Sequence, residues 1–403
     1  MTSVEEAEKI ILAYAVDYGN EIVPFNRALG RVLAENIKAD RDLPPFNRVT
    51  MDGIAIQYQS FADGIAKFFV KGTQAAGDDP IAITQPDQCI EIMTGAVVPS
   101  SADTIVRYED VEIEHGYARL LTDKIAKGQN IHVKGVDKKQ GDLLLTPGSV
   151  ITPAVISVLA SVGEYEVRVK RIPRVVIISS GDELVEVDVR PSPTQIRRSN
   201  NYTVQAALKQ AGIDAGMLHI PDDEDATIQA IQQCLHNYDV ILLSGGISMG
   251  KFDYIPKALK ALKVEQLFHK VKQRPGKPFW FGKHDNGVVV FAFPGNPVAT
   301  FMCLTRYFFP WLQASLGLLE KPFIYAVLNR SFQFEPDLQY FLQVKLHFDV
   351  QGRLLAEPVE GNGSGDFANL ADTDAFMELP SEKRKFEKGE VYRVWPFDHS
   401  RLV

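Results

Sequence analysis

The sequence predicts a multi-domain chain of the α/β plus β class, built around a doubly wound parallel sheet. Three observations predict it: the chain has 403 residues, apolar strands alternate with amphipathic helices over residues 172–320, and the pattern turns to β alone from about Lys321. A domain usually takes about 100–200 residues, so about two to four domains are expected. We expect a discontinuous N-terminal domain (1–45 and 140–171), an inserted mixed β-rich domain (46–139), the α/β domain (172–320) and a small C-terminal β-barrel (321–403).

Composition excludes several classes of protein. The formal net charge is −8, and no basic stripe of the kind that binds a duplex is visible, so no nucleic-acid partner is expected. No apolar stretch approaches the about 18 residues that cross a bilayer. The acidic start MTSVEEAEKI is unlike a basic secretory signal, so we expect a cytoplasmic protein without a membrane partner. The three cysteines are far apart and have no metal-ligand spacing, so we expect buried thiols.

The N-terminal and inserted domains have short elements. Ser3 and Glu6 form a capping box that predicts a helix at the start of the chain. Short β-like runs such as Gly53–Gln57 follow, separated by Gly, Pro and Asp turns. Thr152 before Pro153 predicts the start of another helix, because threonine caps well and proline is favoured at the first helical position.

The α/β domain has the clearest pattern. Continuous apolar strands alternate with amphipathic helices, which is typical of a parallel sheet covered on both faces. The four predicted strands are Arg174–Ser179, Ala215–Ile220, Asp239–Leu243 and Val288–Phe293. In the C-terminal region, alternation over Tyr340–Val350 and short strands around Leu354, Phe376 and Val391 predict a small barrel or sandwich.

Polar and glycine-rich segments follow each strand of the α/β domain. Ligands of open α/β sheets bind outside the carboxyl ends of the strands, so these segments are the first candidates for a site. Carboxylates suit Mg²⁺ bridged to a phosphate, and glycines let backbone N–H groups approach it. We expect Glu183 and Asp222 to be functional, whereas Asp223–Asp225 are expected to start a helix. The four segments are SSGDE (179–183), PDDED (221–225), SGGISMG (244–250) and PGNP (294–297).

Two further segments are candidates for anion binding. Gly245–Lys251 nearly fits a P-loop, but Phe252 stands where a hydroxyl must hold Mg²⁺, so a Gly-rich phosphate or pterin cradle is favoured over a P-loop phosphotransferase. Residues 270–277 hold four cations, and the Pro-Gly-Lys-Pro turn presents Lys277 to an anion. The alternative is a solvated basic edge.

Seven motifs spread over the chain are similar to those of one family. The chain resembles the molybdopterin molybdotransferases of the MoeA/gephyrin E-domain family, and the combination of the first two motifs with the α/β domain is specific to it. The motifs are PPFNRVTMDG (44–53), IMTGAVVPSSAD (92–103), GQNIHVKGVD (128–137), SSGDEL (179–184), SGGISMGKFDY (244–254), RPGKP (274–278) and PGNPV (294–298).

The resemblance implies a fold and a reaction. It implies an elongated homodimer whose α/β domain is MogA-like and binds the pterin. Molybdopterin-AMP (adenylylated molybdopterin) and molybdate would be the substrates, molybdenum would be placed on the dithiolene, and AMP would leave with the help of Mg²⁺. The implied partners are molybdopterin adenylyltransferase and molybdoenzyme apoproteins or their chaperones.

The resemblance also implies site residues. Asp52 and Asp137 would face the α/β domain of the partner subunit and act with the α/β carboxylates in catalysis. Glu183, Asp222 and Asp253 would be catalytic and would also bind the metal ion. The substrate-binding residues would be Thr94, Gly245, Gly246, Ser248, Gly250, Arg274, Lys277, Pro278, Pro294, Asn296, Pro297 and Ser364.

Several positions depart from the family pattern. Arg274 stands where the family usually has Lys, which changes a point charge into a planar fork. His132-Val133-Lys134 replaces a more Arg-rich stretch, and Ala299 follows PGNPV where Ser is common. Gln339 and Gln343 stand in the β-domain where Arg is frequent. These departures predict weaker oxyanion binding than in a relative with all the cations. The alternatives to molybdate insertion are a pterin-binding scaffold without turnover and the insertion of tungsten.

Overall fold

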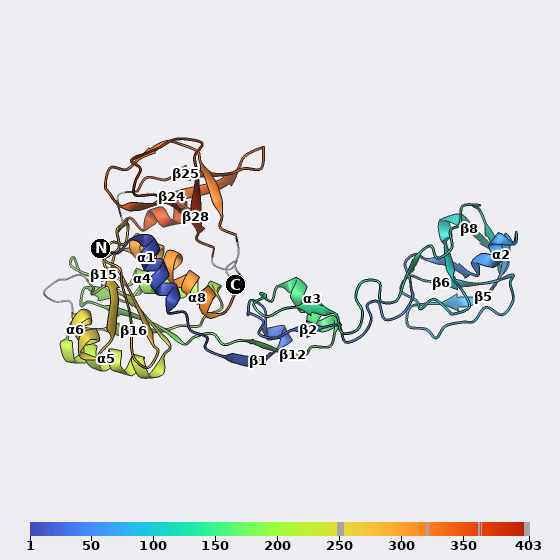
Figure 1. Cartoon of the computed structure of the whole chain (residues 1–403), viewed down its shortest axis with the longest axis horizontal. Coiled ribbons are helices and arrows are strands. Elements are labelled where there is room, and N and C mark those ends of the chain that lie inside the picture. Colours follow the sequence, from blue (N-terminus) through green and yellow to red (C-terminus); the bar gives the residue numbers. More distant parts are fainter. Residues whose placement is uncertain (248–253, 320–321, 362, 364, 399–403) are drawn as a thin grey trace. The chain divides into compact units, whose positions relative to one another are not determined.

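A computed structural model describes residues 1–247, 254–319, 322–361, 363 and 365–398 (Figure 1). The chain divides into two compact units. The larger holds Met1–Glu35, Pro147–Ile156 and Glu166–Val403, and the smaller holds Asn36–Thr146 and Ser157–Tyr165. Among the described residues, none of the helices combines the length and the apolar character needed to cross a bilayer.

The larger unit begins with helix α1 (Val4–Ala13). The Ser3 hydroxyl accepts a hydrogen bond from the Glu6 N–H at 3.1 Å, which confirms the predicted N-cap. Val4, Ala7 and Ile11 recur at helical spacing and are buried, so α1 packs its apolar face into the core of the α/β domain.

A six-stranded sheet forms the centre of this unit. Its order is β16-β13-β17-β21-β20-β18, with the first four strands parallel as predicted and the last two antiparallel. The two antiparallel strands, which lie on either side of the basic turn, were not predicted. The strands are β13 (Val175–Ser180), β16 (Gly216–Ile220), β17 (Val240–Ser244), β18 (Glu265–His269), β20 (Trp280–Lys283) and β21 (Val289–Phe293).

Helices cover both faces of this sheet (Figure 1). Successive strand residues point to opposite faces: Ile177 packs with α4 and the helix after β21, whereas Ile178 packs with α5 and α6. This arrangement confirms the doubly wound architecture. The helices are α4 (Ser199–Gln210), α5 (Glu224–Asn237), α6 (Tyr254–Ala261) and a continuous run of α7 (Pro297–Cys303), a π-turn (Leu304–Phe308) and α8 (Phe309–Ser315).

The C-terminal region is a closed five-stranded barrel. Strands pair in the order β24-β25-β22-β28-β26, and β26 pairs again with β24, so no edge remains open among these five. The parallel pairing of β19 (Gln273–Arg274) with β24 joins the barrel to the α/β domain. The barrel strands are β22 (Tyr325–Leu328), β24 (Gln339–Phe348), β25 (Leu354–Pro358), β26 (Ala375–Leu379) and β28 (Val391–Pro396).

The smaller unit is built on a second six-stranded sheet. Its order is β7-β4-β6-β5-β9-β8, with β5 and β6 parallel and the other pairs antiparallel. The mixed β-rich character agrees with the prediction. The elements of this sheet are β4 (Gly53–Ile56), β5 (Lys67–Gln74), β6 (Gln88–Ile92), β7 (Thr104–Arg107), β8 (Val111–Glu114), β9 (Tyr117–Leu120) and the flanking helix α2 (Tyr58–Ala62).

Short elements complete the two units. Thr152 accepts from the Val155 N–H at the start of α3, as predicted. The two-stranded pairs are β1 (Asn20–Pro24) with β12 (Glu166–Lys170), β2 (Ile37–Lys38) with β11 (Leu143–Leu145), β3 (Arg48–Val49) with β10 (Ile131–His132), β14 (Leu184–Val185) with β15 (Ile196–Arg197) and β23 (Phe332–Gln333) with β27 (Lys385–Phe386). The remaining helical segments are α3 (Pro153–Ser161), η1 (Phe25–Arg27), η2 (Tyr108–Asp110) and η4 (Ala368–Asp372).

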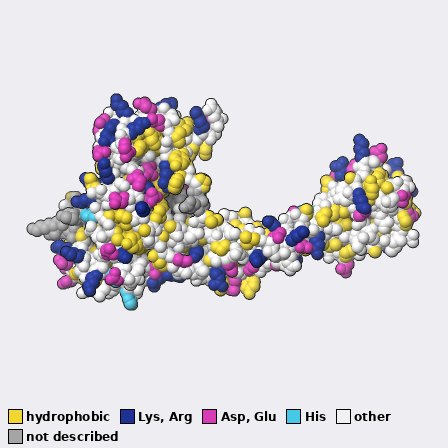
Figure 2. Space-filling model, viewed as in Figure 1, with side chains coloured by type: hydrophobic (Ala, Val, Ile, Leu, Met, Phe, Trp, Pro, Cys, Tyr) yellow, Lys and Arg dark blue, Asp and Glu magenta, His cyan; other side chains and the backbone are white. Residues whose placement is uncertain are grey.

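Charged side chains of both signs lie on the surface (Figure 2), and the cysteines lie in the interior. Figure 2 shows acidic and basic side chains interspersed on the visible faces of the units. Cys89, Cys234 and Cys303 are free and buried, as predicted. Burial raises the pKa of Cys234 to about 11, so its thiol stays protonated at neutral pH.

A buried cation joins three parts of the larger unit. Arg306 lies in the π-turn and is only 2% exposed. Its guanidinium is 2.9 Å from the Glu8 carboxylate of α1 and 3.5 Å from Glu378 of β26, and it lies over the Trp395 ring. Burial disfavours the charge, but Glu378 and Glu8 more than offset this effect and raise the pKa of Arg306. The trio Glu8, Arg306 and Glu378, called the Arg306 cluster below, therefore links α1, the α/β domain and the barrel.

Replacement of Arg306 by methionine tests this link. Arg306→Met leaves two mostly buried carboxylates without their cation, so the free energy of unfolding should fall by about 3–5 kcal/mol. Tryptophan fluorescence in urea would measure it, since all three tryptophans (Trp280, Trp311 and Trp395) lie in the larger unit.

Arg330→Met is the matched control. Arg330 pairs with Glu357 at 3.2 Å on the barrel surface, where its side chain is 51% exposed, so this loss should stay below about 1 kcal/mol. Equal shifts of the two urea midpoints would contradict the special role of the buried cluster.

Candidate functional site

The carboxyl ends of the parallel strands are tied together by one asparagine. The Asn200 side-chain nitrogen lies 2.7 Å from the Gly295 carbonyl oxygen, 3.1 Å from the Ser244 hydroxyl and 3.3 Å from the Thr300 hydroxyl. The Thr300 hydroxyl in turn donates to the Pro294 carbonyl. The ends of β17 and β21 are therefore held at one edge, and Asn200 is a residue that the sequence reasoning missed.

The two glycine-bearing loops at this edge approach each other backbone to backbone. A Cβ on Gly295 would lie 3.6 Å from the Gly245 Cα, so only small residues allow this spacing. Gly246 has φ +67°, and a Cβ there would lie 2.6 Å from the Ser180 hydroxyl. The backbone of the next residue, Ile247, forms a hydrogen bond with the His269 ring. Gly245, Gly246, Pro294 and Asn296 are thus brought together, and Pro297 starts α7 after the N-cap Asn296.

Two carboxylates lie side by side at the ends of β13 and β16. The Asp182 N–H donates to Asp222 Oδ2 at 3.3 Å, and the Asp222 N–H donates to Asp182 Oδ1 at 3.2 Å. Glu183 is exposed, and its carboxylate lies 2.4 Å from where a Cβ on Gly181 would be, so it folds back over that glycine. Asp182 was not predicted, although the SSGDEL motif contains it.

The helix-start interpretation of the next acidic residues is confirmed. Asp223 is the N-cap of α5 and accepts from the Ala226 N–H at 2.8 Å, and Glu224 and Asp225 occupy the first turn. Within the described residues, no group of three or more His, Cys, Asp or Glu side chains is placed to hold a metal ion. Mg²⁺ commonly takes only one or two carboxylates and completes its shell with phosphate and water, so the Asp182–Asp222 pair fits such an ion.

Ser179, Asn201 and His219 form a hydrogen-bonded group next to the Asp182–Asp222 pair. Ser179 is buried, and its hydroxyl lies 3.0 Å from the Asn201 side-chain nitrogen and 3.1 Å from His219 Nδ1. The amide nitrogen can only donate, so the hydroxyl accepts from Asn201 and is free to donate to His219 Nδ1. Burial lowers the pKa of His219, and Arg198 adds to this effect. A neutral His219 therefore lies next to Asp182 and Asp222.

The basic turn packs against the helix that follows the PGNP loop. Arg274 and Lys277 are exposed, and Pro278 is half-buried. Gln273 holds the turn from inside, since its amide donates to the Gly276 carbonyl at 3.1 Å and accepts from the Tyr307 hydroxyl. A Cβ on Gly276 would lie 2.7 Å from the Cys303 sulfur, so this position needs glycine. The two cations of the turn are available to an anion.

A second locus lies in the smaller unit. Asp52 is exposed, and its Oδ1 accepts from the Thr94 N–H at 2.6 Å. This hydrogen bond, with a second from the Thr94 side chain, lowers the pKa of Asp52 and keeps it ionised. The Asp52 carbonyl accepts from the Tyr108 N–H, and the next residue, Gly53, has no room for a side chain because a Cβ would lie 2.0 Å from the Val106 carbonyl oxygen. Two predicted site residues, Asp52 and Thr94, are therefore in contact.

Asp137 has its own partners in the smaller unit. Its carboxylate lies 3.0 Å from His132 Nε2, and His132 Nδ1 lies 3.2 Å from the Arg48 guanidinium. The side chain of Asp137 is 57% exposed. The loop that carries it is pinned by the Lys134 N–H, which donates to the Asn47 side chain at 2.9 Å.

Three positions that depart from the family pattern lie in the interior or near it. Ala299 and Gln339 are buried, and the Gln339 amide donates to Glu378 of the Arg306 cluster. The Gln343 amide nitrogen is buried and has no hydrogen-bond partner within the described residues. Ala299 and Gln339 are therefore not on the surface, and Gln339 is paired with Gln273, next to Arg274. The expected effect of these departures on oxyanion binding stays a prediction.

Four predicted site residues lie outside the part of the chain that the structure describes: Ser248, Gly250, Asp253 and Ser364. Their roles remain predictions.

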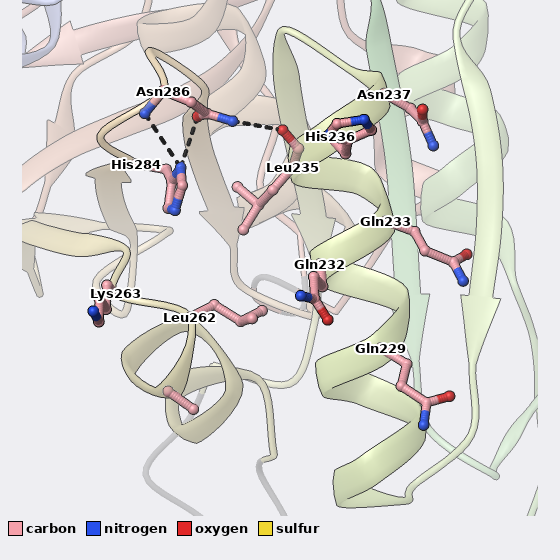
Figure 3. Close-up of a pocket in the computed structure, with 11 residues that line it drawn as sticks. Gln229, Gln232, Gln233, Leu235, His236, Asn237, Leu262, Lys263, His284 and Asn286 are labelled. Carbon is pink, nitrogen blue, oxygen red and sulfur yellow. Dashed lines mark hydrogen bonds between the residues drawn. The ribbon is translucent and has the colours of Figure 1, made fainter.

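A cavity of about 690 Å³ lies at the opposite end of the α/β sheet (Figure 3). Its lining comes from the C-terminal parts of α5 and α6 and from the turn before β21. Asn286 joins two walls, because its Nδ2 donates to the Leu235 carbonyl at 2.8 Å and its Oδ1 lies 2.7 Å from His284 Nδ1. This cavity lies at the amino ends of the parallel strands and is separate from the predicted site.

Known families match almost the whole chain. The MoeA N-terminal region (domain I and II) matches residues 2–163, a probable molybdopterin binding domain matches residues 176–314, and the MoeA C-terminal region (domain IV) matches residues 325–397.

Individual relatives match over the same extent. A protein of Synechocystis sp. named molybdopterin molybdenumtransferase is 38% identical over 395 residues, which cover 97% of this chain and 99% of the relative. A protein of the same name from Staphylococcus epidermidis is 33% identical over 399 residues, or 97% of this chain and 94% of the relative. Two crystal structures of the MoeA protein of Pyrococcus horikoshii give TM-scores of 0.81 and 0.82 at 29% and 25% identity, each covering 98% of this chain and 99% of the other.

Gly53→Ala should destabilise the smaller unit. The Cβ would lie 2.0 Å from a backbone oxygen, which cannot move without shifting β7, so the expected loss is about 2–3 kcal/mol. Amide hydrogen exchange of the smaller unit would measure it. Gly72→Ala is the control, because its Cβ would meet only the end of the Ile81 side chain, at 3.2 Å. Equal protection in the two variants would contradict the close approach at Gly53.

The stability of the larger unit should fall on acidification. Burial lowers the pKa of His219 and of His269 below the ordinary value of 6.5, so the unfolded chain binds these protons first. Stability is therefore full above about pH 6.5 and decreases as the pH falls below it. Urea midpoints between about pH 7.5 and 5 would follow this loss.

Two variants test whether His219 and His269 cause the loss of stability at low pH. His219→Asn and His269→Asn should each lose less stability over this pH range than the wild type, since each lacks one titrating ring. Profiles that run parallel to the wild type in both variants would show that other groups cause the pH dependence.

Proposed function

The chain belongs to the MoeA family of molybdopterin molybdenumtransferases, and from this premise we propose that it inserts molybdate into molybdopterin-AMP with release of AMP. It is a transferase of molybdenum cofactor biosynthesis. The observation that carries the proposed site is the meeting of the Gly245 and Gly295 backbones beside the Asp182–Asp222 pair.

The proposed phosphate site uses backbone and carboxylate groups. Glycine loops at the carboxyl ends of strands let N–H groups approach a pyrophosphate without steric hindrance from side chains. Glu183 and Asp222 would hold Mg²⁺ together with Asp253, and Asp182 adds a carboxylate next to Asp222. When bound there, Mg²⁺ would supply positive charge to the phosphate of the departing AMP.

The proposed oxyanion site is the basic turn. Arg274 and Lys277 are exposed, and Gln273 fixes the backbone between them. The guanidinium of Arg274 offers a planar fork to an oxyanion where a lysine offers a point charge. No protein nucleophile is required, because the dithiolene of the pterin is the metal ligand. Catalysis in this proposal is positioning together with electrostatic stabilisation. Tungstate is chemically similar and is the alternative oxyanion.

The proposed role of the second locus depends on assembly. Following the family pattern, Asp52, Thr94 and Asp137 would complete the site of a partner subunit in a homodimer. We also keep as proposals the four-domain division and a cytoplasmic location. The proposed partners are a molybdopterin adenylyltransferase that supplies the substrate and molybdoenzyme apoproteins or their chaperones that receive the product.

AMP release from molybdopterin-AMP tests the proposal. With Mg²⁺, release should depend on molybdate, and Asp222→Asn and Asp52→Asn should each lower the rate by about 100-fold, because each removes a charge placed at the reacting groups. Release would be measured by chromatography of the free nucleotide.

Asp223→Asn is the matched control for Asp222→Asn. It lies one residue away, and asparagine caps a helix as well as aspartate does, so turnover should stay at the wild-type level. Tight pterin binding without AMP release, even at high molybdate or tungstate, would replace the enzyme by a pterin-binding scaffold.

A further inference from the structure

Three side chains of the smaller unit form a chain that ends at Asp137. Arg48 and His132 are paired residues of β3 and β10. The Arg48 guanidinium lies 3.2 Å from His132 Nδ1, and His132 Nε2 lies 3.0 Å from Asp137 Oδ1. Within the described residues, the Asp137 carboxylate has no other hydrogen-bond partner.

The chemistry of arginine fixes the proton of the histidine. A guanidinium can only donate, so Nδ1 of His132 must accept. A neutral imidazole that accepts at Nδ1 carries its proton on Nε2, and this N–H then donates to Asp137. The cation at Arg48 thus aligns the carboxylate through a neutral ring, without pairing with it directly.

Backbone hydrogen bonds hold the loop that carries Asp137, whereas His132 is the hydrogen-bond partner of the Asp137 carboxylate. The Asp137 N–H donates to the Leu43 carbonyl at 3.0 Å, and the Gly135 N–H donates to Pro44 at 2.9 Å. Lys134, a cation of the same loop, lies 3.6 Å from Asp42 instead. The backbone is therefore placed by residues 43–44, and the direction of the exposed carboxylate is set by His132.

We propose that His132 is a positioning residue, through which Arg48 fixes the direction of the Asp137 carboxylate toward the substrate. The proposal rests on the function proposed above for Asp137. A neutral donor suits this task, because it orients the carboxylate without placing a second charge against it, as a direct contact with a lysine or arginine would.

The first test reads the tautomer and needs no activity. In the full chain with ¹⁵N-labelled histidine, the His132 signals should show a protonated Nε2 and an unprotonated Nδ1, and His132→Gln assigns them by their loss. Arg48→Met combined with Asp137→Asn removes both the donor and the charged acceptor that hold the ring and should give a mixture of tautomers. Arg41→Met is the control, since Arg41 is exposed and only 4.0 Å from Asp40. A wild-type His132 that carries its proton on Nδ1 would overturn the proposal.

The second test measures kcat of AMP release and asks whether His132 acts through Asp137. His132→Ala should lower kcat by about tenfold, as expected when a group that orients a site residue is lost. His132→Gln should restore most of kcat, because its amide both donates and accepts. His132→Ala should add nothing to Asp137→Asn, since His132 acts through that carboxylate.

The outcomes separate this proposal from the proposed function. Losses of His132→Ala and Asp137→Asn that multiply in the double variant would assign His132 a structural role and overturn the positioning role. Full turnover in Asp137→Asn would remove the catalytic role of Asp137 and the positioning role with it. Wild-type molybdate-dependent AMP release in that variant would still support the proposed function of the enzyme.

Discussion

The larger unit depends on the burial of one positive charge. Arg306 is 2% exposed at the point where α1, the π-turn and the barrel meet. A buried guanidinium is stable only if carboxylates accompany it, and Glu8 and Glu378 supply them from segments about 370 residues apart in the sequence. The same Glu378 accepts from Gln339 and from the Trp395 indole, so barrel strands are fixed by the same charge. Through Arg306, α1 and the barrel are therefore both attached to the helical run that begins at the PGNP loop.

That helix connects the buried charge to the predicted site. Asn296 occupies its N-cap position, the Thr300 hydroxyl donates to the Pro294 carbonyl, and Cys303 packs under Gly276 of the basic turn. The glycine loops and the two exposed cations are thus placed by one rigid element. In the smaller unit the equivalent constraint is Gly53, where two strands approach so closely that no side chain fits beside Asp52. In both units, polar groups for chemistry lie next to backbone positions that only glycine can occupy.

Much of the fold could be predicted because its signals are local. The apolar strands of residues 172–320 and the caps at Ser3 and Thr152 depend on neighbouring residues in the sequence. Strands β18 and β20 were missed, because an antiparallel extension at a sheet edge has no signal of its own. Asp182 and Asn200 were missed for a related reason. Their roles arise from contacts between loops 40 to 100 residues apart, as in the exchange of hydrogen bonds between Asp182 and Asp222.

The sequence by itself determined the family and the doubly wound sheet, because motifs and hydrophobic period are properties of short segments. Only the tertiary structure decided which side chains meet. It placed Gln339 beside Glu378 in the interior. It also placed His132 between Arg48 and Asp137 and thereby fixed the position of a proton. The direction of a side chain and the polarity of its neighbours depend on distant strands, and these contacts are formed only when the chain folds.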